Sequence, residues 1–132
     1  MKTLDVMQRI EDALTLKHQI PFEPGSCFEQ ALELLVFNDN VTSLIHGIAT
    51  GSTKSEFPGK RFAHAWIEIQ VLGEWFVIDA SAQSGPFPRE FYYEAGRIKP
   101  EECVRYDRQS AMRKAYHQNT AGPWHKYPEG VL

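Results

Sequence analysis

Two segments near the start of the chain, residues 5–17 and 26–36, carry apolar residues at steps of three and four. The apolar positions are Met7, Ile10 and Leu14 in the first segment, and Phe28, Ala31, Leu32 and Leu35 in the second. This spacing is that of an amphipathic helix, so we expect two helices here. Residues 20–25 include prolines and a glycine, which predicts a break between the helices.

The middle of the chain is rich in apolar, β-branched and aromatic residues and predicts strands over residues 41–49, 61–71 and 75–80. Leu72 and Gly73 form a short turn between the last two strands, which makes them a hairpin. One face of this hairpin is uniformly apolar, and we expect it to face the core. Its residues are Ala63, Ala65, Ile67, Ile69, Val71, Phe76 and Ile78.

The length of the turn fixes the register of the hairpin. With two turn residues, Val71 pairs with Glu74, and the second face carries a mixed set of side chains. That face consists of His64, Trp66, Glu68, Gln70, Trp75, Val77 and Asp79. His64 and Asp79 are then diagonal neighbours, roughly 7–8 Å apart and within reach of a hydrogen bond. A slip of one residue would move Asp79 to the opposite face, and the plainer alternative is two exposed polar residues near a sheet edge.

The rest of the chain has weaker patterns. Residues 51–59 and 84–88 read as polar or Pro/Gly loops, residues 101–116 as a helix, and residues 122–130 as an irregular tail. Helices followed by adjacent strands predict an α+β fold, in which the second helix packs against an antiparallel sheet. The length of 132 residues predicts a single domain, residues 1–132.

Composition narrows the class of protein. The apolar fraction of 42% and charged fraction of 23% are ordinary for a globular protein, and the net charge of −3 speaks against nucleic acid as a partner. No apolar run is long enough to span a membrane, and the N-terminus does not resemble a secretory signal. Two cysteines are too few for a disulfide framework, so we expect a cytoplasmic protein with reduced thiols. Residues 97–126 are locally basic, which predicts either a solvated face or a surface for an acidic partner.

The two cysteines differ in their surroundings. Ser26 and Glu29 have the spacing of a capping box, which places Cys27 at the first position of the helix. Unpaired N–H groups and the helix dipole favour a thiolate there, and the thiolate is the nucleophilic form of cysteine. Cys103 follows Glu101 and Glu102, whose negative charges disfavour a thiolate. Cys27 is therefore the candidate nucleophile.

These residues resemble the transglutaminase-like core of the papain-like cysteine-enzyme superfamily. The resemblance runs from about residue 24 to residue 80. It is carried by Gly-Ser-Cys opening an amphipathic helix, by His-Ala-Trp-Ile-Glu on one strand, and by Trp-Phe-Val-Ile-Asp-Ala on the next. Papain-type proteases place their His roughly 130–150 residues after the Cys, so the compact transglutaminase-like arrangement is the better match.

The resemblance implies a catalytic triad of Cys27 as nucleophile, His64 as general base and acid, and Asp79 as the group that orients His64. The Cys27 backbone N–H would donate to the oxyanion, and Gln19 is the candidate for the second donor. The implied reaction is acyl transfer at an amide of a protein or peptide, as in a peptidase, a glutamine deamidase or a transglutaminase. A catalytically silent protein-binding module on the same fold is the competing interpretation.

Three further interpretations stay open from the sequence. Trp66 and Trp75 either line a substrate groove or pack on the sheet. The triad residues could instead bind zinc, but no metal or other cofactor is expected. The aromatic tail, residues 121–127, either folds back over the sheet or serves as a docking element, and packing is favoured because exposing these aromatics would be costly.

Overall fold

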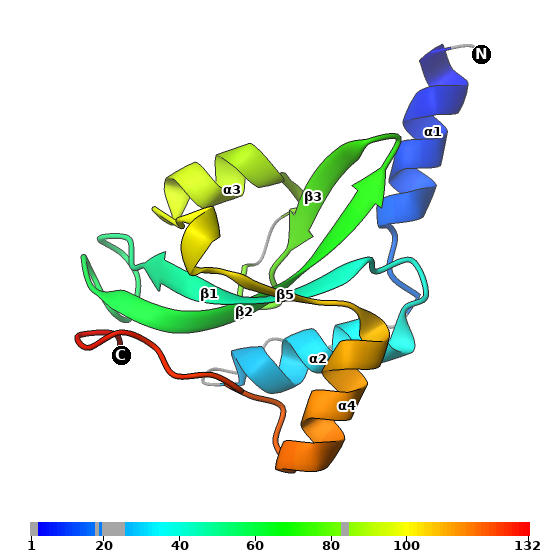
Figure 1. The fold of residues 1–132 in the computed structure, drawn as a ribbon. Helices are drawn as coiled ribbons and strands as arrows, with labels where there is room; N and C mark the ends of the chain where they lie inside the picture. The colour runs from blue at the N-terminus through cyan, green and yellow to red at the C-terminus, as the bar shows by residue number, and fades with distance from the viewer. Residues whose placement is uncertain (1–2, 18, 20–25, 83–84) are drawn as a thin grey trace.

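The computed structural model describes residues 3–17, 19, 26–82 and 85–132. Within them, four α-helices and a five-stranded antiparallel sheet form an α+β fold, as predicted (Figure 1). The elements in chain order are α1 (Thr3–Leu14), α2 (Cys27–Phe37), β1 (Ser43–Thr50), β2 (Arg61–Val71), β3 (Glu74–Ile78), β4 (Phe87–Pro88), α3 (Arg89–Ala95), the 3-10 turn η1 (Pro100–Glu102), β5 (Val104–Tyr106) and α4 (Arg108–Gln118). The predicted break at residues 20–25 and residue 84 of the predicted 84–88 loop lie outside the described residues.

The sheet has the strand order β4-β3-β2-β1-β5, and its central hairpin has the predicted register. Val71 pairs with Glu74, and Ile67 with Ile78. Leu72 and Gly73 both have positive φ, at 52° and 82°, which is the conformation of a two-residue turn whose twist matches that of the strands. Glycine adopts it without the steric penalty that Leu72 bears.

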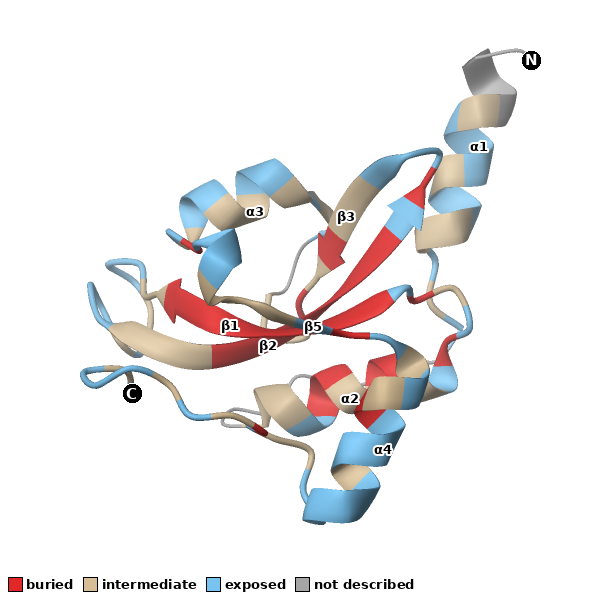
Figure 2. Ribbon diagram, in the orientation of Figure 1, coloured by how far each residue is buried: buried red, intermediate tan, exposed pale blue. Residues whose placement is uncertain are grey.

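Both faces of the sheet are covered. Helices α2 and α4 lie on one side and α3 lies on the other (Figures 1 and 2). The predicted apolar face packs with α2 into the larger core cluster, which includes Ala65, Ile67 and Ile69. Much of the mixed face is buried as well, because Trp66 and Val77 form a second cluster with the tyrosines of α3 and with Ile98, whereas Gln70 is exposed.

The predicted helix over residues 101–116 is wrong in its first half. Residues 104–106 instead add β5 to the free edge of β1, with Leu44 opposite Tyr106. Asp107 then starts α4, because its side chain accepts a hydrogen bond from the Ser110 backbone N–H at 2.8 Å. Sequence reasoning also missed α3, whose tyrosines pack on the second face.

The C-terminal tail folds back over the sheet, as favoured from its sequence. Trp124 is buried and its Nε1 donates to the Thr120 carbonyl at 2.7 Å. At the very end, Leu132 exchanges backbone hydrogen bonds with Arg61 and Ala63 on the outer edge of β2. In the part of the chain that the structure describes, no helix is both long and apolar enough to cross a bilayer.

Candidate active site

Cys27 is the first residue of α2, as predicted, and it is half-buried. The predicted capping box is wrong in its chemistry, because the Ser26 side chain makes no capping hydrogen bond. The other end of α2 is fastened instead: the Arg108 guanidinium donates to the carbonyl oxygens of Leu35 and Asn38. The C-terminal end of the helix is thereby tied to α4.

His64 and Asp79 form a buried pair. His64 Nε2 lies 2.8 Å from Asp79 Oδ2, and the two residues are 6% and 9% exposed. The diagonal contact predicted from the hairpin register is therefore present. Burial of this kind is stable only when the polar groups satisfy one another, and this pair does so.

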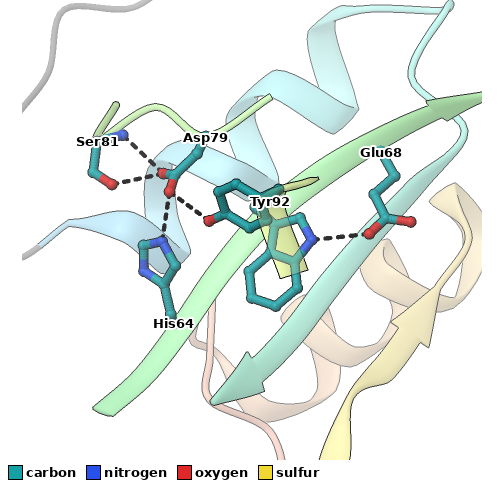
Figure 3. A network of polar contacts seen from close by, with 6 residues as sticks. His64, Glu68, Asp79, Ser81 and Tyr92 are labelled. Atoms are coloured by element: carbon teal, nitrogen blue, oxygen red, sulfur yellow. Dashed lines mark hydrogen bonds and ion pairs between the residues drawn. The ribbon is translucent and has the colours of Figure 1, made fainter. Parts of the chain in front are cut away.

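The Asp79 carboxylate accepts hydrogen bonds from other groups besides the His64 imidazole (Figure 3). Its Oδ1 accepts hydrogen bonds from the backbone N–H and the hydroxyl of Ser81, at 2.9 and 2.7 Å. Its Oδ2 also accepts from the Tyr92 hydroxyl at 2.6 Å. Sequence reasoning missed both partners. Ser81 could have been found from the turn chemistry of an Asp followed by Ser two residues later, whereas Tyr92 needed the position of α3.

The electrostatics of the site favour an imidazolium. Burial lowers the pKa of His64, but its hydrogen bonds to Asp79 and to the Cys27 side chain raise it to about 10 overall. Burial raises the pKa of Asp79, but the hydrogen bond and charge of His64, with Tyr92 and Ser81, lower it to about 2. The opposite directions mark an ion pair.

His64 thus interacts with both Asp79 and Cys27. Because Asp79 occupies Nε2, Nδ1 is the ring nitrogen left for the thiol of Cys27. The three groups form a chain through the imidazole rather than three ligands converging on one point. Among the described residues, no group of three or more His, Cys, Asp or Glu side chains is arranged to hold a metal ion.

A second polar network surrounds Glu68, at a distance from Asp79 (Figure 3). Glu68 is fully buried and accepts hydrogen bonds from Trp66 Nε1 at 3.0 Å and from the Tyr93 hydroxyl at 2.6 Å. It also pairs with Arg105 at 2.8 Å and with Arg89 at 3.5 Å. These contacts leave no exposed surface on Glu68 and fix α3 to the sheet.

Trp66 and Trp75, the candidates for a substrate groove, both pack against neighbouring side chains of the fold. Trp66 has no exposed surface and packs in the second core cluster, so it does not line an open groove in this structure. Trp75 is half-buried, and the guanidinium groups of Arg89 and Arg105 lie 5.0 and 5.1 Å from its ring. Both contacts belong to the Glu68 network.

Cys103 also lies beside the Glu68 network. Burial and the charge of Glu68 raise the pKa of its thiol to about 11, with Glu102 a minor cause. A raised pKa of the Cys103 thiol is the direction expected from the sequence. Its main causes, however, are burial and the charge of Glu68 rather than the two preceding carboxylates.

Gln19 is exposed and borders the same cavity, about 370 Å³, as Asp79. The structure thus brings Gln19 to the Asp79 side of the site. Residues 20–25, which connect Gln19 to the Cys27 helix, lie outside the described residues.

His46 is a buried histidine that sequence reasoning did not single out. Its ring is fully buried on β1, among Phe28, Tyr106, Trp124 and His125. Neither ring nitrogen has a hydrogen-bond partner within the described residues, and burial, with the nearby His125, lowers its pKa to about 3. A neutral His46 therefore joins the aromatic tail to the first turn of α2.

Comparisons with known proteins give no relative from which a role for these residues could be taken. Searches against family models, curated proteins and solved structures find no match to the chain.

Proposed function

We propose that this protein is a cysteine-dependent enzyme that transfers an acyl group from an amide of a protein or peptide. The observation that carries the proposal is the buried His64, which bonds Asp79 through Nε2 and interacts with the thiol of Cys27. A nucleophile next to a base, with the base oriented by a third group, is the arrangement that activates a thiol. The α+β fold, with Cys27 at the start of a helix on an antiparallel sheet, is compatible with a transglutaminase-like core.

The proposed reaction begins from an ion pair, in which His64 has taken the proton of the Cys27 thiol. The Cys27 thiolate attacks the carbonyl carbon of the amide, and the oxyanion accepts a hydrogen bond from the Cys27 backbone N–H, with Gln19 as the candidate second donor. His64 then gives its proton to the leaving amine as the C–N bond breaks, which leaves a thioester on Cys27. Water or a second amine attacks the thioester and passes a proton to His64, and the C–S bond breaks to release the Cys27 thiolate, which restores the starting ion pair.

Asp79 acts through His64. Its charge stabilises the imidazolium that accompanies the thiolate, and its hydrogen bond fixes the ring orientation. Tyr92 and Ser81 in turn hold the carboxylate, so that the imidazole cannot rotate away from the thiol. The acceptor, water or amine, decides between hydrolysis, deamidation and cross-linking.

The proposal is tested by incubating the protein with dimethylated casein, with and without a biotinylated primary amine, and measuring intact mass. Cleavage, replacement of an amide nitrogen by oxygen, or a conjugate to the amine would each identify the reaction. The Cys27→Ala variant must lose the activity, and the Cys103→Ala variant must keep it. An unchanged substrate with the wild-type protein, repeated with a peptide library, would favour the protein-binding module instead.

A further inference from the structure

The aromatic tail, residues 121–127, closes over a histidine whose ring has no polar partner among the described residues. His46 on β1 has no exposed surface, and neither of its ring nitrogens is hydrogen-bonded within that part of the chain. The centroid of its ring lies 4.8 Å from that of Phe28 in α2, 5.1 Å from that of Tyr106 in β5 and 4.7 Å from that of Trp124 in the tail. An imidazole enclosed by aromatic rings in this way is stable in its neutral form.

Among the described residues, the groups that face His46 offer no negative charge to balance a proton on its ring. From the tail, the His125 ring stacks at 6.1 Å, and its own Nδ1 is buried without a hydrogen bond. Tyr106 is the titratable group on β5, whereas α2 contributes Phe28, β2 places Ala65 opposite, and β1 carries no other titratable side chain. Burial and the nearby His125 lower the pKa of His46 to about 3. Protonation therefore works against the closed arrangement.

The tail is the most weakly fastened wall around His46. Ladder hydrogen bonds join β1 to β2 and β5, and α2 keeps its own helical bonds. Within the described residues, no backbone hydrogen bond joins residues 121–130 to another element, and the next such bonds are those between Leu132 and β2. The tail instead packs tightly: a Cβ on Gly122 would lie 2.6 Å from His46 Cε1 and 2.9 Å from the Phe28 ring. A charge on His46 is thus most easily relieved by moving the tail.

We propose that the tail is an acid-released strap, which leaves the sheet and the first turn of α2 when His46 takes up a proton. Release lets water reach the imidazolium, while the sheet and the helices keep their backbone hydrogen bonds. The strap goes beyond the proposed function, because it concerns the position of the tail and not the chemistry of Cys27. An effect of release on acyl transfer, through the first turn of α2, would rest on that function.

The size of the effect follows from the pKa of His46 in the two positions of the tail. The pKa is about 3 under the closed tail, and the solvated ring regains its ordinary value of 6.5 after release. The closed state therefore binds fewer protons, so its stability is complete above pH 6.5 and is lost as the pH falls toward 3. The ratio of released to closed tail should rise about tenfold per pH unit below 6.5, or about 100-fold between pH 7.5 and pH 4.5.

Hydrogen exchange of the indole N–H groups, followed by NMR, measures this ratio even when release is rare. Trp124 Nε1 donates to the Thr120 carbonyl at 2.7 Å within the tail region, and Trp66 Nε1 donates to Glu68 at 3.0 Å in the core. Each exchange rate is divided by that of free tryptophan at the same pH to give a protection factor. The protection of Trp124 should fall about 100-fold from pH 7.5 to pH 4.5. Trp66 should stay at least about tenfold better protected at every pH, because release leaves the core folded.

Variants assign the acid dependence to His46. His46→Phe, which keeps an aromatic ring without a titratable nitrogen, should reduce the fall in Trp124 protection to less than about tenfold, and His46→Leu should do the same. His117→Gln, which alters an exposed histidine on α4, is the matched control and should leave the fall unchanged. Trp124 protection that is flat down to pH 4.5, that equals the protection of Trp66 throughout, or that keeps its full acid dependence in the His46 variants would overturn the strap. None of these measurements involves Cys27, so they leave the test of its thiol chemistry separate.

Discussion

Replacing Asp79 by alanine should destabilise the protein strongly and in a pH-dependent way. The substitution removes the partner of His64 Nε2 and the acceptor for Tyr92 and Ser81, all at 2.6 to 2.9 Å. It leaves a buried imidazole without its counter-charge. Breaking a buried pair by removing one partner costs about 3–5 kcal/mol, so a loss of that size in the free energy of unfolding is expected near pH 6.

The pKa shifts of Asp79 and His64 determine how this loss of stability changes with pH. The folded pKa of Asp79 is lowered to about 2, so its contribution is present above its ordinary pKa of 3.8 and is lost as the pH falls toward 2. The folded pKa of His64 is raised to about 10, so its contribution is present below its ordinary pKa of 6.5 and is lost as the pH rises through 10. The difference between wild type and variant should therefore be largest between about pH 4 and pH 6.5.

Urea unfolding measured from pH 3 to pH 10 checks this prediction. The gap in unfolding free energy between the wild type and Asp79→Ala should narrow on both sides of the plateau, at an unchanged m-value. Asp12→Asn, which alters an exposed carboxylate, serves as the control and should shift stability by less than about 0.5 kcal/mol. A gap below about 1 kcal/mol at pH 6, or one that is constant with pH, would refute the buried ion pair.

Three further substitutions test the surroundings of the site. Tyr92→Phe removes the hydroxyl that bonds Asp79 and should cost about 1.5–3 kcal/mol in urea unfolding, whereas a neutral effect would mean that the bond contributes nothing. Gly47→Ala should lower stability by about 1–3 kcal/mol, because a Cβ there would lie 2.6 Å from the Trp66 ring; an equally stable variant would show that the ring can move aside. Trp124→Ala should cost about 3–5 kcal/mol by thermal unfolding if the tail is part of the core, and little if the tail is a detached docking element.

The sequence predicted the His64–Asp79 contact better than it predicted the elements that surround it. The His64–Asp79 contact follows from local rules, since a two-residue turn and the two-residue period of a strand determine which side chains share a face. The start of the helix at Cys27 follows from the spacing of Ser26 and Glu29, although the Ser26 side chain makes no capping hydrogen bond. The sequence could not reveal that α3 covers the second face, because the burial of Trp66 and Glu68 depends on residues far along the chain.

The predictions that were wrong also depended on residues far from the segment in question. Residues 104–106 join the sheet because β1 has a free edge, which no local pattern within residues 101–116 encodes. Burial and the charge of Glu68 are the main causes that raise the pKa of the Cys103 thiol, and of the adjacent acids that the sequence displays only Glu102 adds a minor contribution. The two hydrogen-bond partners of Asp79 show the same difference between local and distant residues. Ser81 lies two residues further along the chain and could be predicted, whereas Tyr92 comes from another element, α3.

The most direct test of the account is the rate of alkylation of Cys27 by iodoacetamide as a function of pH, read site by site by mass spectrometry. If the imidazolium of His64 holds a thiolate, Cys27 should react at pH 6 at least tenfold faster than glutathione or Cys103, with little change up to pH 8, and His64→Gln should remove this advantage. A Cys27 rate that rises with pH in parallel with glutathione, and that His64→Gln leaves unchanged, would contradict the activated thiol at the centre of the proposal.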